Sequence, residues 1–412
     1  MSADVGVSQF PGDVDLLSYS RWIRVRSCLL KGAYASTTAI GRLDRSGTHA
    51  AVGRARHLVQ EQVLKGVATG RPAPTPDWVR QQFDLALARE RLELERQWAP
   101  AEVPLIRTWP DVALTRARLA RDLGGHGHGP DEAWAAADCG KEPLAATPLD
   151  PHPQWHQVPA CPPDGSAAAE LVLVDQDRQL VGRVDRLENR SGHLCVVDFK
   201  AGLGQTTQEL VAEHREQLLF YAGLVNAVFG EWPDLEICPV GTSPVPVEYD
   251  PEDVGRLRSQ VMEDRTRLNA ALADGALARA ASPAEPNCTW CPFQVVCPAL
   301  RRSWLDIANH ASGPLHPRIS LAEGEVVDVR SHEHSTEVVL RQPSDLTAPG
   351  GDVTVTNLPP ALEVVVGSQL AVSRISPAGS AVVLRAAWNS WIWPGPAYGV
   401  PKPELERGVD AP

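Results

Sequence analysis

Three short strand-like runs, each rich in Val and Leu, constrain the fold of this chain more than any other sequence feature. They span residues 170–174, 179–187 and 193–199. The segments 175–178 and 189–192 separate them, and both have the composition of tight turns. A long amphipathic run at about 207–229 follows, and another strand-like run lies at 236–240 or 245–249. Strands joined in this way to a helix predict an α/β sandwich with a central sheet.

The rest of the 412-residue chain divides into regions by composition. Helical spacing of apolar residues marks 16–69 and the segments after Pro76 and Pro110, and residues 251–277 predict a further helix. Five β-like runs within 319–385, separated by Gly, Pro and Ser, predict a small barrel of OB- or SH3-like type. We therefore expect a helical N-terminal part (1–69), a helical insertion with a loop (70–165), an α/β core ending in a cysteine cluster (166–305), a β-rich OB-like domain (316–395) and a disordered tail (396–412).

Composition bears on the cellular setting and the partners. The sequence has no run of eighteen apolar residues and no signal-peptide pattern near its start, so we expect a soluble, cytoplasmic protein without membrane association. The net charge of −12 disfavours non-specific coating of DNA. Between Arg21 and His57, however, eight Arg or Lys residues accompany one acidic residue. This local excess is either a solvated helix face or a track for phosphates.

Two carboxylates and one ammonium group are expected to meet at the end of the predicted sheet. Asp198 and Lys200 are two residues apart on one strand, so both project to the same face. Asp185, on the neighbouring antiparallel strand, can lie beside them. Such charges are costly to bury unless a divalent cation holds them, and carboxylate oxygens suit Mg²⁺ or Mn²⁺. A bare Asp-x-Lys pair is more often a surface ion pair, so the surrounding residues decide.

The surrounding residues form an ordered set of motifs. In chain order they are Gly53-x-x-x-His57, Gly182-x-x-Asp185, Asp198-Phe199-Lys200-Ala201-Gly202 and Gln217-x-x-x-Tyr221. This order resembles that of the PD-(D/E)XK nuclease superfamily, and in particular its RecB-like branch. The resemblance covers residues 15–305 and implies a restriction-endonuclease-like fold, in which helices flank a central mixed β-sheet.

The resemblance also implies which residues hold the metal. Asp185 and Asp198 would supply carboxylate ligands to Mg²⁺ or Mn²⁺, and His57 would supply an imidazole. Phe199 would contribute its backbone carbonyl. Glu170 stands where the family often has an acid, which would support the metal site from behind the ligands. Taken alone, His57 is more often a core or surface histidine than a ligand.

Three further residues have implied roles in the reaction. Lys200 would be the catalytic lysine, which orients the attacking water or stabilises the negative charge of the transition state. Gln217 and Tyr221 are four residues apart, hence on one helix face, and would position the DNA or the active-site residues. Without the other motifs, these two residues would fit the polar edge of an amphipathic helix.

A cysteine cluster follows the predicted core. Cys288, Cys291 and Cys297 place three thiols within ten residues, one ligand short of a tetrahedral metal site or an iron–sulfur cluster. By resemblance to AddB-type subunits and CRISPR-associated RecB-like exonucleases, Cys28 supplies the fourth ligand and the group is a structural 4Fe–4S cluster. Zn²⁺ is the alternative, because four thiolates suit it equally well.

Together these features predict a metal-dependent DNA nuclease. The expected enzyme is an exonuclease that hydrolyses phosphodiester bonds of single strands or ends in DNA repair, recombination or phage defence. The sequence contains no G-x-x-x-x-G-K-[ST] loop, so a separate helicase within a repair or defence complex would supply any unwinding. The alternatives are a non-catalytic iron–sulfur DNA-binding or scaffold subunit and a zinc-clasped regulatory protein. The β-rich region would bind single strands, contact a protein or be structural.

Overall fold

The computed structural model describes most of the chain. The described residues are 14, 16–36, 47–68, 71–97, 103, 105–124, 159–200, 206–239, 244–277, 280–282, 285–288, 291–297, 299, 321–341, 352–360, 362–378 and 380–394. Most of the predicted loop before residue 166 and the predicted tail at 396–412 lie outside them. No described helix combines the length and apolar character needed to cross a membrane.

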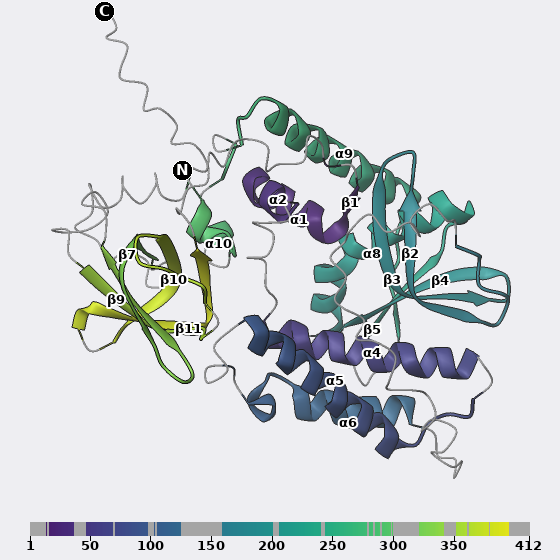
Figure 1. Ribbon diagram of the computed structural model, residues 1–412. Coiled ribbons are helices and arrows are strands. Elements are labelled where there is room, and N and C mark those ends of the chain that lie inside the picture. The colour runs from purple at the N-terminus through teal and green to yellow at the C-terminus, as the bar shows by residue number, and fades with distance from the viewer. Residues whose placement is uncertain are drawn as a thin grey trace, which may run out of the picture.

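A mixed sheet of six strands forms the centre of the larger part (Figure 1). The strands are β1 (Leu17–Ser18), β2 (Ala167–Asp175), β3 (Leu180–Arg190), β4 (His193–Lys200), β5 (Asp234–Pro239) and β6 (Val245–Pro246). Their order is β1-β3-β4-β5-β6, and β2 pairs with the other edge of β3. The pairs β1–β3 and β4–β5 are parallel and the remaining pairs antiparallel. The predicted α/β class with a mixed sheet is thus confirmed, and both alternative positions for the later strand are occupied, by β5 and β6.

Helices pack against this sheet in two groups. They are α1 (Tyr19–Ser27), α2 (Leu29–Ala35), α4 (Thr48–Ala68), α5 (Pro76–Gln97), η2 (Ile106–Thr108), α6 (Val112–Leu123), α8 (Thr207–Phe229), α9 (Pro251–Ala273), α10 (Glu285–Cys288) and η4 (Gln294–Val296). Helix α8 contacts β2 to β5, and α9 packs on α8, α1 and α2. Helix α4 contacts β2 and packs with α5 and α6 in a separate group (Figure 1).

Helix α8 is fixed at both ends and lies unusually close to the sheet. Its first turn is closed by a capping box between Thr206 and Glu209, which satisfies backbone donors that would otherwise lack a partner. It ends at Gly230, whose φ of 76° is the left-handed conformation that glycine adopts without strain. Gly182 of β3 faces its middle, and a Cβ there would lie 2.5 Å from Leu224 Cδ1. The glycine of the Gly182-x-x-Asp185 motif therefore sets how close α8 comes to the sheet.

The C-terminal region is a separate β module with its own hydrophobic core. Its strands are β7 (Leu321–Ser331), β8 (Thr336–Arg341), β9 (Asp352–Leu358), β10 (Gln369–Ala378) and β11 (Ser380–Pro394). They pair in the closed order β10-β11-β9-β8-β7, with β10 also pairing with β7. The last strand is longer than expected, because it continues beyond residue 385, where the predicted β-like runs end, to Pro394. An OB- or SH3-like type stays a prediction.

The β module packs against the end of the larger part. Strands β10 and β11 contact η4, and Ala371 of β10 belongs to the main core rather than to that of its own module. Figure 1 shows the module beside α10, on the side away from β2–β4. The C-terminal module is thus attached to the cysteine-bearing segment.

Candidate active site

The central sheet opens where the predicted acids lie. Along one edge, β3 pairs first with β1 and then, from Arg186 to Arg190, with β4. The intervening residues 182–185 have no strand partner on this edge within the described part of the chain. Beyond Val197, β4 continues with β5 as its strand partner. Asp185 and Asp198 lie on opposite sides of this opening, where side chains from other elements can reach them.

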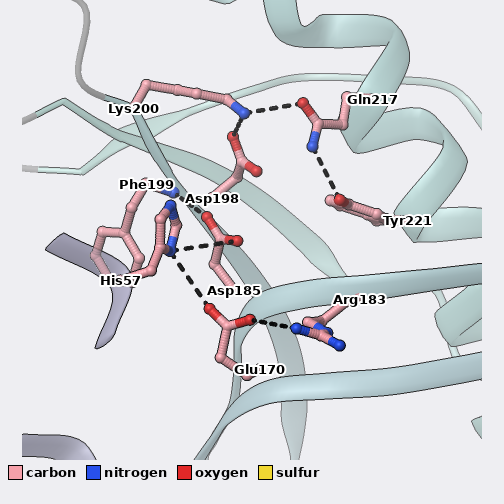
Figure 2. Close-up of polar contacts among 9 residues, drawn as sticks. All are labelled: His57, Glu170, Arg183, Asp185, Asp198, Phe199, Lys200, Gln217 and Tyr221. Carbon is pink, nitrogen blue, oxygen red and sulfur yellow. Dashed lines mark hydrogen bonds and ion pairs between the residues drawn. The ribbon is translucent and has the colours of Figure 1, made fainter. Parts of the chain in front are cut away.

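Three of the residues at the opening could hold a metal ion. His57 on α4 places Nδ1 3.4 Å from Glu170 Oε1 and 3.8 Å from Asp185 Oδ1 (Figure 2). One ligand atom from each residue lies within 4.8 Å of the other two, and no other such group of His, Cys, Asp or Glu occurs among the described residues. Two carboxylates and an imidazole form a donor set that suits Mn²⁺ or Mg²⁺. The residues therefore fit a divalent metal site.

Glu170 reaches this group through an unusual backbone conformation. Its φ is +52°, although it lies inside β2 between residues that pair regularly with β3. A left-handed conformation is rare for a residue other than glycine and costs about 1–3 kcal/mol. Glu170 Oε2 also lies 3.8 Å from Arg183 Nη1, while Oε1 faces His57. The resemblance implies a supporting role for Glu170, whereas its position in the structure makes it one of the potential ligands.

His57 is held by the two acids. Burial by itself lowers the pKa of His57, but the hydrogen bond with Glu170 and the charge of Asp185 outweigh it, so the pKa lies above its usual value. In the absence of a metal, the two carboxylates thus favour the imidazolium form. A divalent ion would take the place of this proton, because metals bind neutral imidazole.

Asp198 is the most deeply buried acid of the site. Its side chain is 1% exposed, and Lys200 Nζ lies 2.8 Å from Oδ2. Burial raises the pKa of Asp198, and Asp185 raises it further, whereas Lys200 lowers it. Oδ1 has no hydrogen-bond donor among the described residues. A buried carboxylate oxygen without a donor is costly, and a bound cation would remove that cost.

A chain of hydrogen bonds runs from Lys200 into the interior. Lys200 Nζ donates to Gln217 Oε1 at 2.9 Å, and Gln217 Nε2 donates to Tyr221 Oη at 2.8 Å (Figure 2). Burial raises the pKa of Tyr221, so its hydroxyl stays protonated. The structure thus brings the predicted residues Lys200, Gln217 and Tyr221 together, and the last two fix the position of the ammonium group.

The end of β4 is tied to Asp185 by one hydrogen bond. The backbone N–H of Phe199 donates to Asp185 Oδ2 at 2.8 Å. Two residues that sequence analysis did not single out also enter the site: Arg183, beside Glu170, and Arg56, whose guanidinium lies over the Phe199 ring. Each is adjacent to, or close to, a motif residue in the sequence. No feature of the sequence indicates that either of them would turn toward the site.

The four predicted cysteine ligands lie around one cavity, called here the cysteine cavity. It is lined by Cys28, Cys288, Cys291 and Cys297, together with Tyr34 and Phe293 among others. Segments that are far apart in the chain are held there by Tyr34 Oη, which donates to the Val296 carbonyl at 2.9 Å. No three of these sulfurs lie within 4.8 Å of one another, so the thiols do not form a compact group. Four thiols suit an iron–sulfur cluster or zinc as donors, but their positions fix neither.

Acidic ligands, an imidazole and a lysine at the open end of a mixed sheet define a metal-dependent hydrolase site. A family model described as the PD-(D/E)XK nuclease superfamily matches residues 16–298, and the chain belongs to that superfamily. Membership implies a metal-dependent nuclease with DNA as its substrate. A comparison with curated proteins found no match.

Proposed function

We propose that the protein is a Mg²⁺- or Mn²⁺-dependent DNA exonuclease of the RecB-like branch that acts on single strands or ends. One observation carries the proposal: the ligand atoms of His57, Glu170 and Asp185 lie within 4.8 Å of one another, beside the buried pair of Asp198 and Lys200. These residues offer a cation three carboxylates and an imidazole, and they offer the substrate a positive charge. Metal-assisted hydrolysis of a phosphodiester can use both.

The residues of the site would have distinct roles in metal binding and in the reaction. His57, Glu170, Asp185, Asp198 and the Phe199 carbonyl hold the divalent ion. When bound, that ion supplies an activated water and offsets negative charge on the scissile phosphate. Lys200 donates to the phosphate or to the attacking water, where its charge stabilises the transition state. Because Gln217 Oε1 accepts a hydrogen bond from Lys200 Nζ at 2.9 Å, the ammonium group is held in place at the opening of the sheet.

Basic residues at the start of the chain would guide the DNA. Most of α1 and the first half of α4 lie in the segment with eight Arg or Lys residues and one acid. Arg26 of α1 pairs with Glu216 of α8 at 2.9 Å, one residue before Gln217. The basic segment thus adjoins the helix that carries the lysine-orienting residues, which supports a phosphate track leading to the site.

We also propose that the cysteine cavity holds a structural 4Fe–4S cluster. The donor set of Cys28, Cys288, Cys291 and Cys297 around one cavity supports this assignment. A tetrahedral zinc site with Zn–S bonds of about 2.3 Å would hold all four sulfurs about 3.8 Å apart. No three of the described sulfurs are that close, so the preference for the iron–sulfur cluster over zinc rests on the resemblance to RecB-like enzymes that carry one.

Absorption and metal analysis test the cluster directly. Protein purified without oxygen should be brown and contain iron, and Cys28→Ser should lose most of both. Cys161→Ser is the matched control, because Cys161 is exposed and does not line the cavity. A colourless protein that contains zinc would show that the cavity holds zinc rather than an iron–sulfur cluster. Iron content unchanged in Cys28→Ser would rule out the assigned ligand set.

Cleavage of end-labelled DNA tests the nuclease. The wild-type protein with Mn²⁺ should release nucleotides from linear single strands and leave circular single strands intact. Asp198→Asn should abolish release, whereas Asp84→Asn, at an exposed ion pair between α5 and α6, should not. Cleavage of the circular strands would show that the protein is an endonuclease rather than an exonuclease. DNA binding without cleavage under any divalent ion would favour a non-catalytic scaffold subunit. A role beside a separate helicase in repair, recombination or phage defence rests on the same result.

A further inference from the structure

Arg56 is a buried cation that has no acidic partner among the described residues. It precedes His57 on α4 and is 2% exposed. Its Nε has no hydrogen-bond partner, and no ion pair joins it to an acid within the described residues. Removing a guanidinium from water without a compensating charge is costly, so a protein keeps such a group only where its contacts have a use.

The contact that Arg56 does make is with Phe199. Its Cζ lies 5.6 Å from the centre of the Phe199 ring. A guanidinium is planar and weakly hydrated, so it stacks on aromatic rings better than an ammonium group does. Burial lowers the pKa of Arg56 to about 10, although Cys238, Asp185 and Asp198 act to raise it. Arg56 is therefore still charged at neutral pH.

The position of Phe199 matters because the sheet is open there. Beyond Val197, β4 is no longer paired with β3, and β5 is its strand partner on the other edge. On the open side, the hydrogen bond from Phe199 N–H to Asp185 Oδ2 at 2.8 Å connects the two strands. A small shift of Phe199 would therefore move the Asp185 carboxylate and the neighbouring Asp198 together.

We propose that Arg56 is a positioning residue of the metal site, which acts by stacking on Phe199 and so holding the end of β4. In this arrangement the ring is clamped between α4 and the sheet, and the backbone of Phe199 keeps Asp185 and its own carbonyl in place for a divalent ion. His57 follows Arg56 directly, so one turn of α4 supplies both a ligand and the support for the opposite strand. The proposal rests on the proposed metal-dependent function, but metal binding can be measured without DNA cleavage.

A simple charge effect predicts a different outcome from a stacking contact. A positive charge close to the site repels a divalent ion, so its removal alone would tighten metal binding. Loss of the clamp would weaken binding, and supporting residues of metal sites typically contribute about 10-fold or more to affinity. Lysine at position 56 keeps the charge but not the planar group. Stacking and charge are therefore separable by substitution.

The experiment is a titration of the full-length protein with Mn²⁺ in the absence of DNA, followed by electron paramagnetic resonance. Arg56→Met and Arg56→Lys should each raise the Kd for Mn²⁺ by about 10-fold or more. Phe199→Leu, which keeps the backbone groups but removes the ring, should have a similar effect. Because both residues act through one contact, the double variant Arg56→Met/Phe199→Leu should be no weaker than either single variant. Arg258→Met is the control.

Arg258 is a matched control because its side chain is also largely withdrawn from solvent, at 12% exposed, but it pairs with Asp175 away from the site. Its substitution should lower the unfolding temperature and leave the Kd for Mn²⁺ unchanged. An Arg56→Met protein that binds Mn²⁺ as tightly as the wild type, or more tightly, overturns the proposal, as do additive losses in the double variant. A wild-type protein that binds no Mn²⁺ overturns the proposed function and this inference together. Binding without DNA cleavage overturns only the proposed function.

Discussion

Glu170 lies 3.4 Å from His57 through Oε1 and Nδ1, and it does so from a left-handed backbone conformation within a β-strand. The contact and the strained backbone conformation occur at the same residue. In the register of β2 with β3, Glu170 lies opposite Asp185, so regular alternation already places the two side chains on the same face of the sheet, and the left-handed conformation occurs at this position. Stability is thus given up at a position where the site gains a potential ligand.

Two substitutions at Glu170 separate these effects. Glu170→Gly and Glu170→Ala both remove the carboxylate and should weaken Mn²⁺ binding by about 10-fold or more. Glycine also relieves the strain, so its variant should be more stable than the alanine variant by about 1 kcal/mol. Thermal unfolding in EDTA and Mn²⁺ titration measure the two quantities. Equal stability of the two variants would show that the φ of Glu170 is not strained in solution.

Lys200 should contribute to the reaction without contributing to metal binding. Lys200→Met removes the positive charge beside Asp198, so we expect the Kd for Mn²⁺ to stay equal or to fall. Cleavage should slow by about 10²–10³-fold, as for the loss of one donor that stabilises a transition state. Gln217→Ala should also slow cleavage, but by a smaller factor, since the ammonium group remains but is less well oriented. A Lys200→Met protein that cleaves at the wild-type rate would contradict this role.

Sequence patterns are sufficient to indicate the residues that act within one element or on adjacent strands. Asp198 and Lys200 alternate on one strand, and their ion pair is the direct result. Gln217 and Tyr221 are one helical turn apart, and their hydrogen bond follows from that spacing. The mixed α/β sheet likewise follows from the run of strands and the helix after them. In each case the spacing of two residues along one strand or helix, or the order of successive elements, determines which groups lie side by side.

Features that depend on how distant elements pack are not visible in the sequence. The φ of Glu170 arises where β2, β3 and α4 meet, and no property of an isolated Glu indicates it. Arg56 reaches Phe199 because α4 packs against the open end of the sheet, although an arginine next to His57 could equally face solvent. The four cysteines line one cavity, but their separations depend on the packing of α2 and η4.

The motif glycines Gly53 and Gly182 should respond to substitution in opposite ways. A Cβ on Gly182 would lie 2.5 Å from Leu224 Cδ1 and 3.1 Å from Tyr221 Cε1, so Gly182→Ala forces α8 away from the sheet. We expect a loss of about 1–3 kcal/mol of stability, together with slower cleavage because Tyr221 moves. Gly53 has no described atom within 4 Å of such a Cβ. Gly53→Ala should therefore stabilise α4 by about 1 kcal/mol. Chemical denaturation measures both, and destabilisation by Gly53→Ala would reveal a contact that this arrangement lacks.

Metal binding should weaken as the pH falls, and at a higher pH than an ordinary histidine would cause. The pKa of His57 is raised by Glu170 and Asp185 despite burial, so the metal-free site takes up a proton while the pH is still above about 6.5. Arg56, which also faces His57, acts in the opposite direction and is outweighed. Because Mn²⁺ needs the neutral ring, the proton competes with the metal throughout this range. The raised pKa of Asp198 adds to the loss at lower pH.

The Kd for Mn²⁺, measured between pH 5 and 9, should therefore rise about 10-fold for each unit of pH below the pKa of His57, because one proton leaves for each ion bound. His57→Gln should bind Mn²⁺ more weakly at pH 8 and should lose this dependence above pH 6, since the proton that competes with the metal is gone. His193→Gln is the control, because His193 is largely exposed and lies at the far end of β4. If His57→Gln keeps the wild-type pH dependence, the competing proton is on another group and His57 is not the titrating ligand.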